Sequence, residues 1–117
     1  MKTMDPFAVF AFYHLGFDDE FKYRFRNIHE TASYFQVSEK AVREFLQREE
    51  LTPERIRHTN FNLSKAHSEA MIMDMDGLSK EAKRAFAQQA FAELRDGQHD
   101  SLREFDDVDY DNLLGLD

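Results

Sequence analysis

The histidine and glutamate at positions 29 and 30 come nearest to a catalytic pattern in this chain. His29-Glu30 begins like the His-Glu-x-x-His helix of zinc proteases, in which two histidines one turn apart bind the metal and the glutamate acts as the base. The second histidine is absent, because position 33 holds a serine, which cannot replace that ligand. We therefore expect no zinc site here.

The other residue types that carry chemistry are no better placed. The chain has no cysteine, which excludes a thiol nucleophile, a disulfide and a cysteine-based zinc site. His58 and His67 lie near acids but without a three-ligand spacing, and the four glycines are scattered rather than gathered in a phosphate-binding loop. The acidic clusters at 106–107 and 109–111 lack the ordered spacing and the glycine of an EF-hand. We expect a protein that is not an enzyme and that uses no metal or cofactor.

Charge is unevenly distributed along the 117 residues, a length that suits one domain. Residues 22–67 hold nine Lys and Arg against six Glu, a balance of +3, whereas residues 98–117 hold seven Asp and Glu against one Arg, a balance of −6. The net charge of −8 therefore hides a mildly basic middle. The start of the chain does not have the form of a signal peptide, and its apolar run, 7–15, is too short to span a bilayer. We expect a cytoplasmic protein without membrane contact.

Residues 27–47 predict two short helices joined by a tight turn. Ala32 falls where the first helix would touch the second, and a small side chain there lets the two backbones approach. Val37 follows the turn and would close the angle between the helices. Ser38 suits the N-cap of the second helix, because its hydroxyl can accept a hydrogen bond from a first-turn amide. The predicted buried stripes are Ile28, Ala32 and Phe35 in the first helix and Val42, Phe45 and Leu46 in the second.

This order of small residue, turn, capping serine and apolar pair resembles the helix-turn-helix units of bacterial repressors and activators. The resemblance is one of motif, and it covers about a fifth of the chain. It implies a second helix that enters the major groove of DNA, in a protein that forms a homodimer as most such readers do. One departure is Gln36, at the turn position normally held by glycine, where a left-handed backbone costs about 1–2 kcal/mol for other residues. A plain helical hairpin inside a bundle is the alternative.

The resemblance also implies roles for polar residues by position. Arg43 would pair with guanine and Gln47 with adenine, and Glu39 would accept a hydrogen bond from cytosine. The candidates for contacts with base edges are Glu39, Lys40, Arg43 and Gln47; those for phosphate contacts are Lys22, Arg24, Arg26, His29, Arg48, Arg55 and Arg57. Against this interpretation, Glu39 and Glu44 share the exposed face and would be repelled by phosphates.

The remaining pattern completes an all-α domain of five or six helices over residues 1–97. An apolar helix is predicted over 6–15, with Gly16 ending it. Aromatic and basic residues alternate before the two-helix unit, and we predict an extended segment over 20–26 that leads to an N-cap at Asn27. A helix is the alternative, because Phe17, Phe21, Phe25 and Ile28 also fit a helical stripe.

Three further helices are predicted after the two-helix unit. Residues 52–54 have the cap, proline and acid of a strong helix start, and this helix should end near His58. The next helices should cover 63–73 and 80–96, with Gly97 stopping the last one. The predicted buried stripe of the last helix consists of Ala82, Ala85, Phe86, Ala90, Phe91 and Leu94.

From residue 98 onward, Asp-rich sequence surrounds isolated apolar residues that keep neither a helical nor a strand period. We predict a mobile, disordered acidic tail over 98–117 that can become ordered on a partner. The partner-binding candidates in it are Phe105, Val108, Tyr110, Leu113 and Leu114. A solubilising end with no binding role is the alternative.

Two functions are compatible with these patterns. The first is a small DNA-binding protein, a transcriptional regulator or an accessory to one, whose acidic tail competes with DNA for the basic face. The second is a non-enzymatic adaptor that uses the same scaffold without DNA and docks its tail or its aromatic first helix on another protein. The motif and the local positive charge favour the first. A continuous positive strip formed by Arg24, Arg26, Arg43 and Arg55 would support it, whereas bases neutralised by glutamates would count against it.

Overall fold

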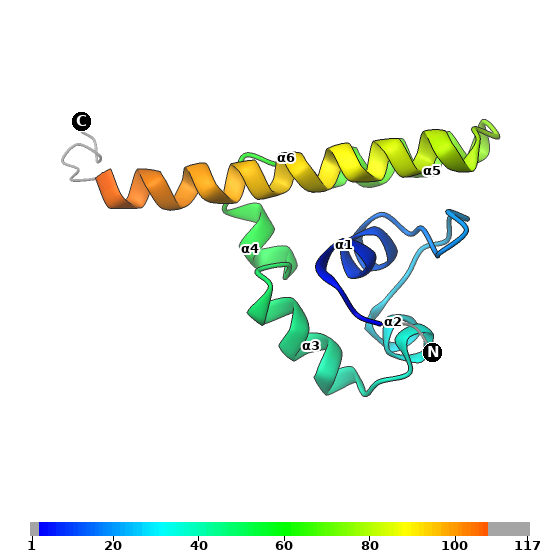
Figure 1. Ribbon diagram of the computed structural model, residues 1–117, viewed down its shortest axis with the longest axis horizontal. Helices are drawn as coiled ribbons and strands as arrows, with labels where there is room; N and C mark the ends of the chain where they lie inside the picture. The colour runs from blue at the N-terminus through cyan, green and yellow to red at the C-terminus, as the bar shows by residue number, and fades with distance from the viewer. Residues whose placement is uncertain (1–2, 108–117) are drawn as a thin grey trace.

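The computed structural model describes the backbone of residues 3–107 and the side chains of residues 3–98. Within this part of the chain all regular structure is helical, and the prediction of an all-α fold is confirmed. The elements are α1 (Pro6–Val9), the π-helical turn η1 (Phe10–His14), α2 (Ile28–Phe35), α3 (Glu39–Arg48), α4 (Pro53–Arg57), α5 (Leu63–Met75) and α6 (Lys80–Asp107) (Figure 1).

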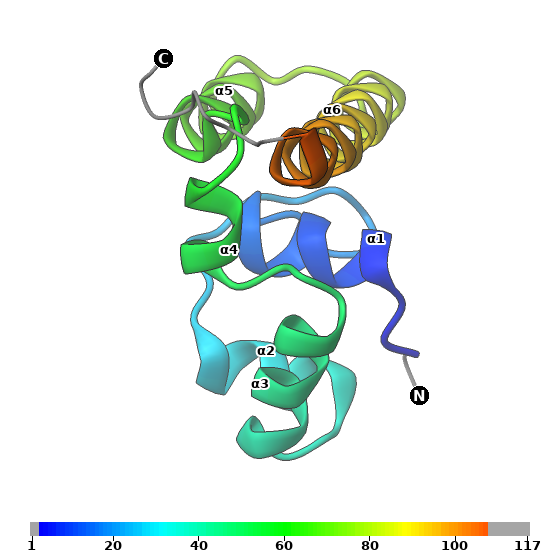
Figure 2. The ribbon, with the colours of Figure 1, turned by 90° about the vertical axis from the view of Figure 1, so that its left-hand side faces the viewer.

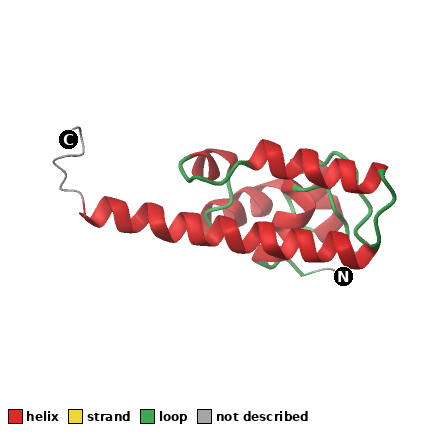
Figure 3. Ribbon diagram, turned by 90° about the horizontal axis from the view of Figure 1, so that it is seen from above, coloured by secondary structure: helices red, strands yellow, loops and turns green. Residues whose placement is uncertain are grey.

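The helices form three layers, seen most clearly in Figure 2. Helices α5 and α6 lie side by side in one outer layer, α1 and α4 lie in the middle, and α2 and α3 form the other outer layer. The turn η1 packs against both α2 and α6, so that Phe10 and Leu15 are fully buried between the layers. Seen from above, α6 projects beyond the rest of the body at its C-terminal end (Figure 3).

The first helix begins as predicted but widens into a π-helical turn after the four residues of α1. Asp5 caps it, because its Oδ1 accepts a hydrogen bond from the amide of Ala8 at 3.0 Å. The amide of Leu15 then donates to the carbonyl of Phe10, five residues back, at 3.3 Å, which is the bonding of a π-helix. Gly16 ends the run with φ +85°, and a Cβ there would lie 2.5 Å from the carbonyl oxygen of Arg24. The predicted stop at Gly16 is confirmed, whereas the π-helical turn was not predicted.

The segment between η1 and α2 is irregular and contains no helix, and Phe21 within it has a left-handed φ of 59°. Its regular pairing is one antiparallel bridge between Phe17 and Tyr23. The Oδ1 of Asp18 accepts hydrogen bonds from the amides of Glu20 and Lys22 at 2.9 and 3.0 Å, which closes the turn between the bridged residues. The side chain of Asn27 then accepts from the amide of Glu30, so that the predicted N-cap of the next helix is confirmed.

Helices α2 and α3 meet at a corner formed by residues 36–38. Gln36 takes the left-handed backbone, with φ 61° and ψ 46°, and the amide of Val37 donates to the carbonyl of Ala32 at 3.0 Å. The hydroxyl of Ser38 accepts a hydrogen bond from the amide of Ala41 at 3.0 Å and caps α3. Ala32 is buried, so the small side chain sits in the interior as expected.

We expect glycine at position 36 to stabilise the protein, because Gln36 is exposed and has the positive φ that glycine adopts without cost. The change Gln36→Gly should raise the free energy of unfolding by about 0.5–1 kcal/mol, since relief of the left-handed backbone exceeds the added freedom of the unfolded chain. Urea denaturation followed by circular dichroism measures this. The control is Gln47→Gly, inside α3, which should lower stability by about 1 kcal/mol; a loss at both positions would contradict the prediction.

The later helices largely follow the sequence pattern. Thr52 caps α4, which ends at Arg57, and α5 ends at Met75, two residues beyond the predicted end. In α6 the predicted stripe is partly wrong, because Ala85 is exposed while Ala87 and Lys83 are buried.

The predicted end of the last helix at Gly97 is also wrong, because α6 continues to Asp107. A glycine inside a helix costs only about 1 kcal/mol relative to alanine. Tertiary contacts offset this cost: the amide nitrogen of the Gln98 side chain donates to the carbonyl of Glu50 at 2.6 Å, and its oxygen accepts from Arg95 at 2.6 Å. Gln98 is buried and belongs to the domain rather than to the tail.

The candidate residues of the predicted tail fall largely outside the described part of the chain. Phe105 lies in α6, but its side chain is not described. Val108, Tyr110, Leu113 and Leu114 lie outside the described residues, and their proposed role stays a prediction.

Candidate functional site

The four base-edge candidates lie together on α3. Its apolar stripe of Val42, Phe45 and Leu46 is buried, which turns the opposite face to solvent. Lys40, Arg43 and Gln47 are exposed on that face, and Glu39 is half-buried.

The basic side chains of this face form ion pairs with glutamates of the same helix. Arg43 lies 3.6 Å from Glu39, and Lys40 lies 3.9 Å from Glu44, both pairs being one helical turn apart. Glu39 also faces His29 of α2, whose Nδ1 lies 3.1 Å from a carboxylate oxygen. Exposed pairs of this kind contribute only about 0.2–1 kcal/mol each, but they cancel much of the field that a phosphate would meet.

The phosphate candidates are paired in the same way. The shortest nitrogen–oxygen distances are 3.2 Å for Arg24 and Glu30, 3.3 Å for Arg55 and Glu50, 3.7 Å for Arg48 and Glu49, and 3.4 Å for Lys22 and Glu20. Arg57 is exposed on α4.

Arg26 cannot serve as a phosphate contact, because its guanidinium is used inside the fold. The side chain is only 8% exposed and lies 4.4 Å from the centre of the Phe12 ring. Its Nε donates to the carbonyl of Gly16 at 3.1 Å, and its Nη2 donates to that of Lys22 at 3.2 Å. Burial lowers the pKa of Arg26, and the nearby carboxylate of Asp18 opposes that shift. The continuous strip of Arg24, Arg26, Arg43 and Arg55 is therefore not formed.

A partly buried network of hydrogen bonds that the sequence did not indicate joins η1, the segment after it, Leu51 and α5. The Nε2 of His14 donates to the carbonyl of Leu51 at 2.7 Å, and the Nδ1 of His67 donates to the carbonyl of His14 at 3.0 Å. Because Nδ1 of a neutral His67 carries the proton, its Nε2 accepts from the hydroxyl of Tyr23, 2.7 Å away. Burial lowers the pKa of His14 to about 4, against an opposing hydrogen bond to Leu51. These hydrogen bonds hold η1 against α5 and against Leu51, just before α4.

A partly buried ion pair joins α5 and α6. Lys83 of α6 donates to Asp74 of α5 at 2.7 Å, and the amide of Tyr23 lies 3.4 Å from the same carboxylate oxygen. The hydrogen bond from Lys83 lowers the pKa of Asp74. Among the described residues no group of three or more His, Asp or Glu side chains is arranged to hold a metal ion.

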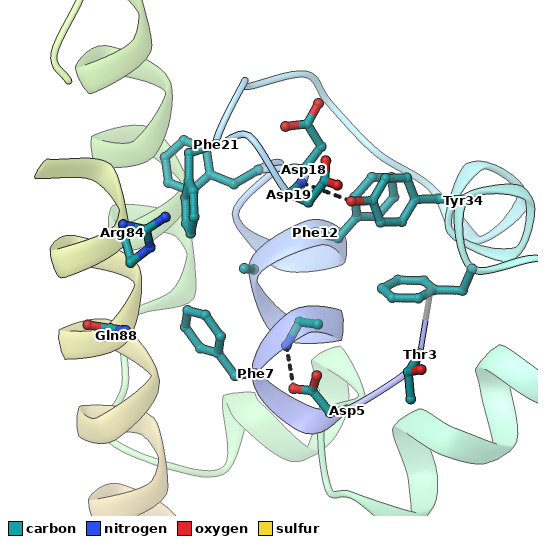
Figure 4. Close-up of a pocket in the computed structure, with 14 residues that line it drawn as sticks. Thr3, Asp5, Phe7, Phe12, Asp18, Asp19, Phe21, Tyr34, Arg84 and Gln88 are labelled. Atoms are coloured by element: carbon teal, nitrogen blue, oxygen red, sulfur yellow. Dashed lines mark hydrogen bonds between the residues drawn. The ribbon is translucent and has the colours of Figure 1, made fainter. Parts of the chain in front are cut away.

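A cavity of about 460 Å³ lies beside the first helix (Figure 4). Its walls come from α1 and η1, the turn at residues 17–21, the end of α2, and α6. The lining residues are Thr3, Asp5, Phe7, Ala8, Ala11, Phe12, Phe17, Asp18, Asp19, Phe21, Tyr34, Phe35, Arg84 and Gln88. The aromatic first helix had suggested a docking element, but the contribution of α6 could not be read from the sequence.

The wall formed by Tyr34 is fixed from two sides. Its ring stacks on Phe12 with centroids 4.1 Å apart, and its hydroxyl accepts a hydrogen bond from the amide of Asp19 at 2.8 Å. Burial raises the pKa of Tyr34 to about 12, so the hydroxyl keeps its proton at neutral pH. This wall of the cavity is therefore held in place.

Comparison of the chain with family models, with curated proteins and with solved structures finds no match. In the described residues, no helix combines the length and the apolar character needed to cross a bilayer.

Proposed function

We propose that this protein is a non-enzymatic protein-interaction module in which the α2–α3 corner serves as a scaffold rather than as a reader of DNA. The observation that carries the proposal is the pairing of the basic side chains of α3. Lys40 and Arg43 each lie within 4 Å of a glutamate. DNA binding of this class draws most of its affinity from the neutralisation of phosphates by unpaired Lys and Arg. On the exposed face of α3 the glutamates already neutralise the Lys and Arg side chains, so this face should bind phosphates only weakly.

DNA binding is the second candidate, and one feature favours it. The α3 face is turned outward opposite a buried stripe, and the side chains of Lys40 and Arg43 are well exposed. Weak surface pairs can also rearrange on contact with a stronger anion. The resemblance of the corner to a helix-turn-helix thus keeps DNA as a hypothesis that a binding titration can decide.

The deciding measurement is fluorescence anisotropy of labelled mixed-sequence duplex DNA at low salt, where nonspecific binding is strongest. We expect only background DNA binding by the full chain and by a shortened chain that lacks residues 108–117. The double change Glu39→Gln and Glu44→Gln serves as a positive control, because it unmasks Lys40 and Arg43 and should raise any DNA affinity. Salt-dependent binding by the unchanged protein, lost on the changes Lys40→Glu and Arg43→Glu with the helical spectrum intact, would refute the module proposal and establish DNA binding.

A further inference from the structure

One face of α5 carries apolar side chains that the described part of the chain leaves uncovered. Met71, Ile72 and Met75 are three and four residues apart, so they share a face of the helix, and all three are exposed. Met75 is 74% exposed and Ile72 is 50% exposed, whereas Ala66 and Ala70 on the opposite face are buried. An apolar stripe on the solvent side of a helix indicates a contact surface.

The C-terminal residues of the same chain cannot cover this stripe. From the α5–α6 connection, α6 runs for 28 residues, a length of about 42 Å, and it ends at the opposite side of the molecule (Figure 1). Residues 108–117 follow this end, and a stretch of that length spans at most about 36 Å when fully extended. Met75 lies beside the connection and so beyond their reach, and the stripe needs a partner from another molecule.

The charges at the two ends of α5 are reversed relative to those of the neighbouring helices. Each of α2, α3, α4 and α6 has a glutamate in its first turn, where the positive end of the helix dipole favours an acid. In α5 the first turn holds Lys65, and the C-cap is Asp76. Lys83 neutralises Asp74 in the last turn, but within the described residues Lys65 and Asp76 have no ion-pair partner. Both residues are exposed, and their charges oppose the dipole of their own helix.

We propose that the α5 stripe docks on the α5 stripe of a second copy, with the two helices antiparallel and a two-fold axis between Met71 and Ile72. An isologous contact of this kind uses the same patch on both subunits. Lys65 then lies near the C-terminus of the other α5 and Asp76 near its N-terminus, where each charge is favourable. The inference concerns a different face from α3 and does not rest on the proposed function.

This register also brings complementary side chains together. With a rise of about 1.5 Å per residue, Lys65 lies about 10 Å from the axis and Asp76 of the second copy about 7 Å from it, on the same side. The two charges are therefore within reach of each other, whereas a parallel pair would set like charges together. Ser68 meets Met75 of the second copy, so a small side chain leaves room for a long one. Glu69 lies farther round α5 from the stripe and stays in solvent.

Sedimentation equilibrium of the full chain at increasing concentration tests the contact. We expect the mass to rise from 13.9 kDa towards twice that value. Ile72→Glu places a charge in the stripe and should hold the protein at the monomer mass, whereas Ala85→Glu, at an exposed position of α6, should associate like the unchanged protein. A monomer at every concentration would overturn the proposal and leave the stripe to a different protein. Equal association of the two variants would overturn it as well.

Exchange of the end charges tests the pairing without disturbing the stripe. Lys65→Asp and Asp76→Lys should each weaken association about tenfold, because each change turns two attractions of the symmetric dimer into repulsions. Both changes also favour the dipole of α5 itself, so unfolding would not explain a loss. The two changes in one chain restore opposite charges and should restore association. A double variant as weak as the single ones would overturn the antiparallel arrangement.

Disulfide trapping reads the orientation directly, because the chain contains no cysteine. Under mild oxidation, a mixture of the Ser68→Cys and Met75→Cys chains should form the mixed disulfide faster than either variant forms a disulfide with itself. Mass spectrometry distinguishes the three products. Faster trapping of Ser68→Cys with itself would indicate parallel helices and overturn the proposal.

Discussion

Replacing Phe10 by alanine is expected to lower the free energy of unfolding by about 3–5 kcal/mol, the usual cost of emptying a fully buried phenylalanine site. Phe10 is fully buried and belongs to η1, which packs against both α2 and α6. Its ring lies 5.4 Å from that of Phe91 and 6.2 Å from that of Phe61, centroid to centroid, so α6 and the α4–α5 connection both lose contact with η1. Urea unfolding followed at the helical band of the circular dichroism spectrum measures the loss.

The control is the same replacement at Phe25, whose side chain is 73% exposed. Phe25→Ala should change stability by less than about 0.5 kcal/mol, as expected for a surface position. Because domains of this size are stable by about 5–15 kcal/mol in total, Phe10→Ala should take a large part of that stability. Equal losses at the two positions would show that η1 does not lie at the centre of the core.

The second large effect is a loss of stability in acid that depends on His14. Its pKa is lowered from 6.5 to about 4, chiefly by burial and in smaller part by the charge of His67. The folded state thus favours the neutral imidazole, and the unfolded chain binds the proton more readily. The stabilising contribution is fully present above pH 6.5 and is lost as the pH falls through about 4. Between pH 6.5 and about 4, the titration of His14 should lower the free energy of unfolding by about 3 kcal/mol.

The measurement is urea unfolding across this pH window for the protein and for His14→Gln, which keeps an N–H donor for the carbonyl of Leu51 but does not titrate. The variant should lose clearly less stability between pH 6.5 and 4 than the unchanged protein. His29→Gln is the control, because the side chain of His29 is 78% exposed and its replacement should leave the acid loss in place. An acid loss that persists in full in His14→Gln would assign it to the carboxylates instead.

The helix starts could be predicted because the signals for them are local. Asn27, Ser38 and Thr52 each accept a hydrogen bond from an amide three residues ahead, so residue type and position suffice. The corner at Gln36 could be predicted for the same reason, since the capping serine and the following apolar stripe bracket it within a few residues.

Features that depend on distant contacts were missed. The helical period of residues 6–15 gives no sign that the carbonyl of Phe10 bonds five residues ahead, because the π-helical turn is set by packing between layers. Gly97 predicts a stop, but the bond from Gln98 to the carbonyl of Glu50, 48 residues away, holds α6 in place there. Local propensity is a weak guide where a tertiary contact of this kind competes with it.

In the candidate site, too, features set by local sequence could be predicted and features set by distant contacts could not. That Lys40, Arg43 and Gln47 share a face follows from helical spacing and could be predicted. The loss of Arg26 to the interior could not, because it depends on the ring of Phe12 and the carbonyl of Gly16 being brought beneath it by the irregular segment. The cavity combines residues from positions 3 to 88, and no short pattern could reveal it.

The end of α3 and the middle of α6 are tied by side chains. Arg95 donates to the carbonyl of Glu49 at 2.9 Å, and Gln98 donates to that of Glu50, so two oxygens just beyond α3 are satisfied by the long helix. A tilt of the projecting end of α6 would therefore act, through these two bonds, on the residues that follow α3. A partner bound beyond residue 98, or a protein fused there, would therefore act through α6 on the end of α3. It would thereby change the orientation of the exposed α3 face.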